Sequence, residues 1–351
     1  MEPLITTIIP THCRPTLLRR AIYSVLNQTY PHLQVCVYDN ASGDETAFVV
    51  AEIAKKDLRV KYYCHSKNIG ALENFIYGMK HIETPFFSCL SDDDIILPNF
   101  YQTAMEEFQR YPNAMFFVGI TAIIENDSKK VVGIVPLLPQ WTKEGEYLPP
   151  DGLIQMFNEG HPNWTSMIFR KEVIEKIGVV NPAIGAPSDS DFILRAATQC
   201  SFVLSKKIYG FLIHHPLSYS VRIGHLPVYV GWIRIIYNLM ADKQIPSDIK
   251  YRLKKEIKKL LFNFGMKIIR DNSMKEGYEM SKILYEQYHL ISASIIFYNL
   301  IKCCKYFPPI PFFIRWLCNI RDSRKKDKCQ QVQKQLEKEI GNISTYLKIV
   351  T

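Results

Sequence analysis

Residues 86–100 read FFSCLSDDDIILPNF and hold the feature around which the rest of the chain is organised. An apolar run ends at three consecutive carboxylates, Asp92, Asp93 and Asp94, and a second apolar run follows up to Pro98. Adjacent like charges repel one another, so a positive charge is needed to stabilise them between apolar flanks. Mg²⁺ and Mn²⁺ suit this place because they bind carboxylate oxygens together with phosphates. In a strand-like segment Asp92 and Asp94 would share a face; an acidic loop after a buried strand is the alternative.

The sequence on either side of this stretch alternates strand patterns with helix patterns. Each expected strand is a short β-branched or apolar run, and each expected helix repeats apolar residues at a spacing of three or four. Strands separated by helices of this length are typical of βαβ units and a parallel sheet. The predicted strands are residues 4–9, 33–38, 60–64 and 86–90, and the predicted helices are 17–26, 46–56 and 71–81.

A polar cluster follows each predicted strand: residues 10–14, 39–44, 68–70 and 92–94. Ligands of open α/β sheets bind at the carboxyl ends of the strands, so we expect these clusters to form one site. The sequence contains neither GxGxxG nor GxxxxGK[ST], the glycine-rich motifs that cradle phosphates. A nucleotide at this site would therefore be held by side chains and a metal ion.

The composition describes a folded protein, because 47% of the 351 residues are hydrophobic and 22% are charged. The nine cysteines are scattered without a CxxC pair, which argues against a zinc site or a disulfide framework and favours reduced thiols. The first residues lack the basic segment of a signal peptide, and no apolar run reaches the roughly 18 residues of a membrane span. We therefore expect a cytoplasmic protein.

Positive charge is concentrated towards the end of the chain. Residues 1–223 contain 20 Lys and Arg against 23 Asp and Glu, whereas residues 224–351 contain 23 against 11. The net charge of +9 therefore comes from the second segment. A basic module of this kind predicts an anionic partner, either a membrane surface or a nucleic acid.

The region after the acidic stretch continues the α/β pattern less regularly. Residues 126–150 are rich in proline and are expected to be irregular, with Trp141 and Tyr147 as satellite core or as a flexible binding wall. The other elements expected in this region are helices at 100–111 and 170–177 and strands at 114–124 and 164–169.

Two further groups of polar residues follow. Asp189 and Asp191 stand in the first turn of a helix that Ser188 or Asp189 caps, where carboxylates suit the positive end of the helix dipole. A role in capping the helix would explain the presence of one of these acids well, but the presence of both less well. His214 and His215 precede a proline, and a buried, hydrogen-bonded core histidine is the structural alternative to a functional one.

The order and spacing of these segments resemble glycosyltransferase family 2 across about residues 4–222. The resemblance implies an α/β fold of the GT-A type (nucleotide-diphospho-sugar transferase, Rossmann-like), with a mixed, mainly parallel sheet flanked by helices. The matching segments are ITTIIPTHCRP (5–15), SVLNQTYPHLQVCVYDNASGDET (24–46), SKNIGALENF (66–75), FFSCLSDDDIILP (86–98), NWTSMIFRKEVIEKIG (163–178), SDSDFILRAA (188–197) and IHHPLSYS (213–220).

This resemblance implies different roles for three parts of the chain. Residues 1–100 would be the nucleotide-sugar-binding half of the GT-A domain, and residues 101–223 would be its acceptor-binding half. Residues 224–351, where the resemblance fades, would be a basic α-helical C-terminal module.

The implied activity is metal-dependent, inverting transfer of a sugar from a nucleotide-diphosphate sugar, with a UDP-sugar favoured, to a hydroxyl of a glycan acceptor. Mn²⁺ or Mg²⁺ would be the cofactor, and the pathway would make a cell-surface polysaccharide or a lipid-linked glycan. A protein or soluble acceptor is the alternative within the class. A metal-dependent phosphodiesterase or nucleotidyltransferase would also use three aspartates, but it would not explain Asp39, the Asp189 helix and the His-Pro element together.

The resemblance also implies which residues contact the nucleotide. Asn74 has an alternative reading as a helix-surface amide. The implied contacts are Asp39 with the base, Pro10, Thr11 and Arg14 along the pocket, Asn68, Gly70 and Asn74 on its wall, and Asp92 and Asp93 at the ribose or a metal-bound water.

For the metal, the resemblance implies Asp94 as the direct ligand, with Asp92 and His215 beside it. Many relatives have an acid in place of Ser91, so the division of roles within the acidic cluster stays open. Asp189 matches the general base and Asp191 the second acid of the family motif. A base is needed within hydrogen-bond reach of the acceptor hydroxyl, opposite the leaving diphosphate.

The last part of the chain is predicted from composition alone. Residues 306–326 mix aromatic, proline and basic residues, which suits the interface of an anionic membrane; a helical lid with a solvated basic face is the alternative. We expect peripheral contact with the cytoplasmic face of a membrane and no nucleic-acid partner, and the sequence does not predict an oligomeric state. The expected helices are 228–240, 247–270, 275–288 and 291–302, and residues 330–347 would form a polar helix or a frayed tail.

Overall fold

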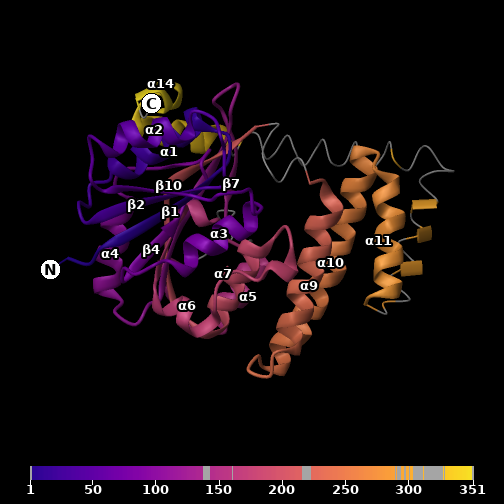
Figure 1. Cartoon of the computed structure of the whole chain (residues 1–351). Helices are drawn as coiled ribbons and strands as arrows, with labels where there is room; N and C mark the ends of the chain where they lie inside the picture. Colours follow the sequence, from indigo (N-terminus) through magenta and orange to yellow (C-terminus); the bar gives the residue numbers. More distant parts are fainter. Residues whose placement is uncertain are drawn as a thin grey trace. The chain divides into compact units, whose positions relative to one another are not determined.

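The computed structural model describes residues 2–136, 143–159, 161–215, 223–288, 290, 294–295, 298–299, 301–302, 311, 327 and 329–349. The chain divides into two compact units (Figure 1). The first unit comprises Met1–Pro182, Asp189–His215 and Cys329–Thr351, and the second comprises Ala183–Ser188 and Pro216–Lys328.

The first unit is built on one ten-stranded mixed sheet. Its strands follow the order β3-β2-β1-β4-β9-β6-β10-β5, with β7 beside β6 and β8 beside β10. The pairs β3–β2, β2–β1, β1–β4 and β6–β10 are parallel. The strands are β1 (Ile5–Thr11), β2 (Leu33–Asp39), β3 (Val60–Cys64), β4 (Phe86–Cys89), β5 (Ile95–Ile96), β6 (Phe116–Glu125), β7 (Val131–Val135), β8 (Gly145–Tyr147), β9 (Met167–Arg170) and β10 (Phe202–His214).

Helices cover both faces of the parallel part of this sheet. Helices α1 (Pro15–Leu26), α2 (Thr46–Ala54) and α4 (Phe100–Arg110) pack in one core with Ile9 and neighbouring side chains of β1 and β2. Helix α3 (Ala71–Lys80) covers the other face. Ile8, which precedes Ile9 in β1, points to that face. A Cβ atom on Gly78 would lie 2.7 Å from Ile8, so glycine permits this close packing. Burial on both faces explains why these strands read as continuous apolar runs.

Short helices connect the remaining strands. Single-turn η1 precedes β9, and α6 ends at Gly178, whose φ of 74° is readily adopted by glycine. These elements are α5 (Asp151–Glu159), η1 (Trp164–Ser166), α6 (Glu172–Ile177), η2 (Pro182–Ile184) and α7 (Ser188–Gln199).

The end of the chain returns to the sheet. Residues 329–340 are helical and are followed by α14 (Ile343–Ile349), drawn in yellow in Figure 1. Leu336 and Leu347 are buried in one cluster with residues of β5, β6, β7 and β10. The helical module predicted for residues 224–351 is therefore divided between the two units.

The second unit contains α9 (His225–Ala241), α10 (Ser247–Asp271) and α11 (Met274–Glu286), which lie side by side (Figure 1). Their contact faces are apolar, and the ring of Tyr229 packs 4.6 Å from that of Phe264. Helix α10 ends at Asn272, which adopts the left-handed conformation that asparagine tolerates. None of the helices that the structure describes is both long and apolar enough to cross a membrane.

The GT-A-type α/β architecture and the four predicted parallel strands are confirmed. The prediction of an irregular segment at 126–150 missed β7 and β8, and the sequence reading also missed β5, α5 and β10. Tyr147 lies in β8 and stacks on Phe202 at 5.2 Å, which fits the core interpretation. Trp141 lies outside the described residues, as do almost all of residues 306–326 and much of 291–302.

Candidate functional site

The three aspartates that follow β4 form a tight turn. The Asp94 N–H donates to the Ser91 carbonyl at 3.1 Å, so this segment does not continue as a strand. All three side chains are buried, with 4–8% of their residue surface exposed. The expectation that Asp92 and Asp94 share a face is therefore wrong. Asp92 and Asp93 converge instead, because the turn rotates successive side chains differently from a pleated strand.

Arg14 joins the carboxylates of Asp92 and Asp93. Its Nη1 lies 3.0 Å from Asp92 Oδ1 and 3.0 Å from Asp93 Oδ2. The Thr11 hydroxyl also donates to Asp92 Oδ2, at 2.8 Å. Arg14 reaches this position after a sharp bend at Cys13, whose φ is 54°. Burial raises the pKa of Asp92 to about 6, helped by the charge of Asp93 and opposed by Arg14.

His215 and Arg20 complete the surroundings of Asp93. His215 directly follows β10, and its Nε2 lies 2.9 Å from Asp93 Oδ2. Arg20, on the buried face of α1, donates from Nη2 to the Asp93 carbonyl at 3.0 Å. Within the described residues its Nε has no hydrogen-bond partner, and burial lowers its pKa. Sequence reasoning missed Arg20, although a charged residue among the apolar positions of a predicted helix was a signal for it.

Asp94 points to different partners. Its Oδ2 accepts from the Thr165 hydroxyl at 2.7 Å, and its Oδ1 accepts from the Ile213 N–H at 3.0 Å. Burial, with the nearby charge of Asp93, raises the pKa of Asp94 well above its usual range. This carboxyl joins the acidic turn to η1 and β10. Each oxygen of Asp94 thus accepts one hydrogen bond from the protein, and the direct metal ligation that the resemblance implied for it stays a prediction.

The side chains at this site include ligand types that suit a hard divalent cation. Across the described residues, no group of three or more His, Cys, Asp and Glu side chains is arranged to hold a metal ion. Asp93 and His215 nevertheless offer an oxygen and a nitrogen within contact of each other. Mg²⁺ commonly uses one or two carboxylates with phosphate and water as its other ligands. Mn²⁺ accepts the same oxygen ligands.

Asp39 lies at the end of β2, beside this cluster in the sheet. It is 1% exposed and accepts from the Ser42 hydroxyl at 2.6 Å and the Tyr62 hydroxyl at 2.5 Å. The Asn40 N–H donates to the Thr11 carbonyl at 3.0 Å, which ties the end of β2 to the end of β1. Pro10 pairs with Tyr38 in the same parallel ladder. The predicted residues on β1 and β2 therefore lie at one edge of the sheet.

The loop before α3 is attached to the same edge. The Asn40 amide donates to Asn68 Oδ1 at 2.9 Å, and the Gly70 N–H donates to that oxygen at 2.9 Å. Gly70 has a φ of 91°, which a side chain would disfavour. Asn74 is 1% exposed and donates to the Tyr38 carbonyl at 2.8 Å, so it is not a surface amide.

The two acids of α7 have different surroundings. Asp191 is 1% exposed, and its Oδ2 accepts from Arg195 Nε at 2.7 Å. Arg195 also donates to the carbonyls of Ile177 and Val179, so this pair fastens α7 to the preceding segment. Asp189 is half-buried and forms no ion pair within the part of the chain that the structure describes. Of the two, Asp189 is therefore the more exposed, and it is the one without a charged partner among the described residues.

Helix α7 packs on the same short element that binds Asp94. The Phe192 ring stacks on Trp164 at 5.6 Å, and Thr165, the next residue, donates to Asp94. No direct contact joins Asp189 to the acidic turn among the described side chains. The structure thus gathers Thr11, Arg14, Asp92, Asp93 and His215 at one point and links α7 to it through η1.

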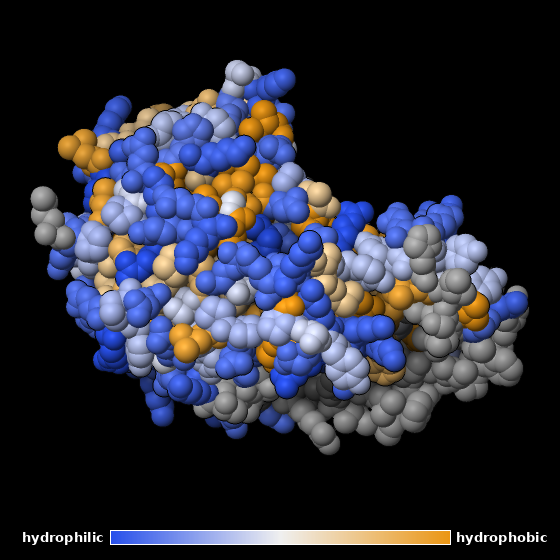
Figure 2. Space-filling model, turned by 90° about the horizontal axis from the view of Figure 1, so that it is seen from below, coloured by the Kyte–Doolittle hydropathy of each residue, from blue (hydrophilic) through white to orange (hydrophobic). Residues whose placement is uncertain are grey.

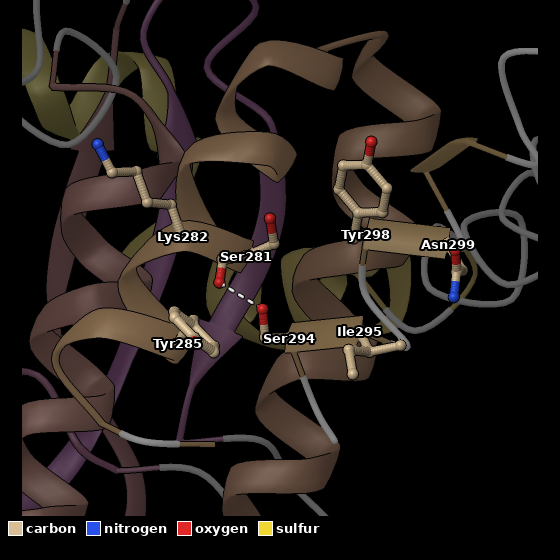
Figure 3. Close-up of a pocket in the computed structure, with 7 residues that line it drawn as sticks. All are labelled: Ser281, Lys282, Tyr285, Ser294, Ile295, Tyr298 and Asn299. Atoms are coloured by element: carbon tan, nitrogen blue, oxygen red, sulfur yellow. Dashed lines mark hydrogen bonds between the residues drawn. The ribbon is translucent and has the colours of Figure 1, made fainter. Parts of the chain in front are cut away.

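A hollow in the second unit is lined by none of the predicted site residues (Figure 3). It has a volume of about 280 Å³, and the Ser294 hydroxyl donates to the Ser281 carbonyl within it at 2.7 Å. Its one charged lining residue, Lys282, is exposed and lies 3.9 Å from Glu286. The hollow is lined by Ser281, Lys282, Tyr285, Ser294, Ile295, Tyr298 and Asn299, none of which provides an acid or an imidazole.

Comparison with known proteins identifies the class. The sequence model described as "Glycosyl transferase family 2" matches residues 6–178. The GalNAc(5)-diNAcBac-PP-undecaprenol beta-1,3-glucosyltransferase of Campylobacter jejuni is 34% identical over 253 residues, which are 71% of this chain and 78% of that protein. The chain therefore belongs to glycosyltransferase family 2.

Solved structures have the same fold at low sequence identity. S. aureus TarS 1-349 in complex with UDP-GlcNAc has a TM-score of 0.63 at 14% identity, covering 86% of this chain and 92% of that one. The mannosyltransferase PcManGT from Pyrobaculum calidifontis, in complex with GDP-Man and Mn²⁺, has a TM-score of 0.53 at 12% identity, covering 88% of each chain. Several further curated glycosyltransferases, from Rickettsia and Haemophilus influenzae, are matched over only 14–38% of their own length.

Proposed function

We propose that this glycosyltransferase is metal-dependent and inverting, and that it transfers a sugar from a nucleotide-diphosphate sugar, with a UDP-sugar favoured, to a hydroxyl of a glycan acceptor. One observation carries the proposal: the acidic turn after β4 meets Arg14 and His215 at the sheet edge that also holds Asp39. Carboxylates, a guanidinium and an imidazole at one point suit a cation–diphosphate pair.

Residues 1–100 would bind the donor. The nucleobase would lie against Asp39, whose carboxylate is held by Ser42 and Tyr62 and so keeps a fixed orientation. Pro10, Thr11 and Arg14 would line the pocket, Asn68, Gly70 and Asn74 would shape its wall, and Asp92 would meet the ribose. The UDP-GlcNAc complex of TarS supports a uridine nucleotide, whereas PcManGT, with GDP-Man, keeps a guanine nucleotide open.

Asp93 and His215 would hold the metal ion in preference to Asp94 and Asp92, the ligands that the resemblance implied beside His215, because Asp93 already contacts His215 and both Asp94 oxygens accept hydrogen bonds from the protein. When bound, Mn²⁺ or Mg²⁺ would supply positive charge to the diphosphate as it leaves. Arg14 would add a second positive charge there, because its guanidinium already lies between two carboxylates of the same turn. The Mn²⁺ present with PcManGT is in line with this choice of cofactor.

Residues 101–223 would bind the acceptor and provide the base. The acceptor hydroxyl oxygen would form a bond to the anomeric carbon while the bond from that carbon to the diphosphate breaks, and the electron pair leaves with the nucleotide diphosphate. Asp189 would take the proton of the hydroxyl. Attack opposite the leaving group inverts the anomeric configuration. Asp191 would hold α7 in place through Arg195.

The acceptor would be a glycan carried on a lipid or destined for the cell surface. The Campylobacter jejuni relative supports this, since its name describes transfer of glucose to an undecaprenol-linked oligosaccharide. A protein or a soluble glycan is the alternative acceptor. A metal-dependent phosphodiesterase or nucleotidyltransferase is the alternative from another class, and it would release or transfer a nucleoside monophosphate.

A donor screen tests the proposal. UDP-, GDP- and dTDP-sugars are added to the protein with and without Mn²⁺, with a CMP-sugar as a control that lacks a diphosphate, and the thermal unfolding midpoint is measured. One diphosphate sugar should stabilise the protein only when the metal is present, by about 2.7 kcal/mol at a hundredfold excess over its Kd. Stabilisation by none of them, or release of a nucleoside monophosphate, would overturn it.

The general base is tested with the donor that the screen identifies. Asp189→Asn should retain donor binding and lose transfer by roughly 10²–10⁴-fold, the usual contribution of a general base. Asp191→Asn should instead lower the unfolding midpoint, because Arg195 would lose a charged partner. Full transfer by Asp189→Asn would remove this residue from the proposed chemistry.

A further inference from the structure

Exposed apolar side chains are common on folded proteins, and on the face shown in Figure 2 they lie in separate patches between hydrophilic ones. The exposed aromatic side chains of α10 differ, because exposed lysines lie between them on the same helix. Tyr251 is 62% exposed and Phe262 is 66% exposed, and the exposed Lys255 and Lys258 lie between them in sequence. We call these four residues the α10 stripe.

The α10 stripe occupies one face of its helix. Its positions are spaced by four, three and four residues, which places the side chains one above another on an α-helix. The opposite face carries the buried residues of α10, among them Leu253, Ile257 and Phe264, which pack within the second unit. The stripe therefore points away from the apolar core of that unit.

Aromatic and cationic groups of the stripe are in contact. Lys255 Nζ lies over the Tyr251 ring, 4.5 Å from its centre, which is the geometry of a cation–π contact. Exposed Lys254 and Lys259 flank the stripe, and Glu256, the nearby acid, is half-buried and 3.4 Å from Lys259. Helix α10 contains eight Lys and Arg against three Asp and Glu.

We propose that the α10 stripe binds the surface of a lipid bilayer that contains anionic lipids. Tyr251 and Phe262 would enter the headgroup region, where aromatic rings are favoured, and the lysines would meet anionic headgroups. Charge complementarity selects an anionic bilayer over a neutral one. A duplex nucleic acid would use the lysines for its phosphates but not the two exposed aromatic rings in line with them.

This inference deepens the proposed function, since an acceptor carried on a lipid lies at such a surface. The biological role of membrane binding rests on the proposed function. The binding itself does not, because it is measured with vesicles that contain neither donor nor acceptor. Failure of one is therefore distinguishable from failure of the other. None of the four residues of the stripe is assigned to donor, metal or acceptor.

The test uses the full chain and co-sedimentation with vesicles. Phosphatidylcholine vesicles are compared with vesicles of phosphatidylcholine and phosphatidylglycerol. The protein should sediment with the anionic vesicles and should stay in the supernatant when the vesicles are neutral. Lys255→Gln and Lys258→Gln should each lower the partition coefficient roughly fivefold, the effect of removing one charge near an anionic surface. Tyr251→Ser combined with Phe262→Ser should also weaken binding, at unchanged charge.

Helix α2 offers a matched control. Phe48 is 64% exposed, close to the value for Phe262, and Lys55 and Lys56 are exposed at the end of that helix. The triple change Phe48→Ser, Lys55→Gln and Lys56→Gln should leave vesicle binding within twofold of the unchanged protein. All variants alter exposed side chains, so their unfolding midpoints should remain close together.

Three results would overturn the inference. They are equal binding to neutral and anionic vesicles, equal losses in the control and stripe variants, and binding to RNA or DNA that the stripe variants lose while vesicle binding persists. If the vesicle results are as expected but no sugar nucleotide is bound or used, the inference stands and the proposed function fails.

Discussion

At the scale of single residues, neighbouring aspartates of the acidic turn have different hydrogen-bond and ion-pair partners. Asp93 lies against Arg14 and His215, whereas Asp94 is held on both oxygens by Thr165 and Ile213. The first carboxylate thus faces two basic side chains, and the second accepts hydrogen bonds from a hydroxyl and a backbone N–H. The two should respond differently to substitution, although they are adjacent in sequence and both are buried.

Asp94→Ala should destabilise the fold. Two buried donors, the Thr165 hydroxyl and the Ile213 N–H, would lose their acceptor, at a cost of about 2–4 kcal/mol in the free energy of unfolding. Asp127→Ala, which removes an exposed carboxylate, is the control and should change this free energy by less than about 0.5 kcal/mol. Chemical denaturation measures both. An Asp94→Ala protein of unchanged stability that no longer binds Mn²⁺ would restore Asp94 as the direct ligand.

Arg14→Gln should change how the metal binds. In the ligand-free protein the guanidinium neutralises Asp92 and Asp93, so a cation has to compete with it. Without nucleotide, the variant should bind Mn²⁺ about tenfold more tightly, equivalent to 1.4 kcal/mol. Electron paramagnetic resonance of free Mn²⁺ gives this affinity without any assay of transfer.

Arg19→Gln is the control for this change, because Arg19 lies in α1, which Arg14 directly precedes, and pairs with the partly exposed Glu52, 3.1 Å away, instead of with the acidic turn. Equal Mn²⁺ affinities for Arg14→Gln and the unchanged protein would show that the guanidinium does not compete for the site.

At the scale of elements, the last helices belong to the sheet. Leu336 is 1% exposed among residues of β5, β6 and β10, and the Val131 N–H donates to the Gln333 side chain at 3.3 Å. Ile95 and Ile213 belong to the same cluster, and each adjoins or contacts Asp94. The end of the chain therefore supports the strands that frame the acidic turn.

Leu336→Ala should lower the free energy of unfolding by about 2–4 kcal/mol, the usual cost of a large-to-small change in a core. Lys338→Ala, at an exposed position of the same helix, should change it by less than about 0.5 kcal/mol. Chemical denaturation again provides the measurement. Equal stability of the two variants would mean that residues 329–349 do not contribute to the core of the first unit.

The sequence predicted the parallel strands and their helices because each has a local pattern of the right length. It did not predict β10, where Ser205, Lys206 and Lys207 interrupt an apolar run that is stabilised by distant strands. Strands β7 and β8 were missed in a proline-rich segment for a similar reason. Their pairing partners lie on β6 and β10, and composition does not show such long-range pairing.

Within the site, the sequence placed the polar clusters at one edge of the sheet, and their order identified the family. It did not show which aspartates converge, because that depends on the turn that follows β4. It also gave no sign of the contacts from Arg20 to Asp93 or from Thr165 to Asp94, which join residues more than 70 positions apart. The roles of these residues in donor binding and catalysis remain predictions.

At the scale of the whole molecule, charge and chemistry are separated. The first unit carries the acidic turn and the acids of α7, and α10 of the second carries eight of the basic residues. This division is the one that the two proposals require, with transfer by the first unit and contact with an anionic surface by the second. The first unit includes both the first residues of the sequence and the helices from Cys329 onwards.

The most direct measurement is calorimetric binding of the nucleotide diphosphate found in the donor screen, with Mn²⁺ and with excess EDTA, to the unchanged protein and to Asp93→Ala. Removal of the metal should weaken binding to the unchanged protein at least tenfold, or about 1.4 kcal/mol, and should leave the already weak binding of Asp93→Ala unaltered. Nucleotide affinity that does not depend on the metal, or the same metal dependence in both proteins, would contradict the account.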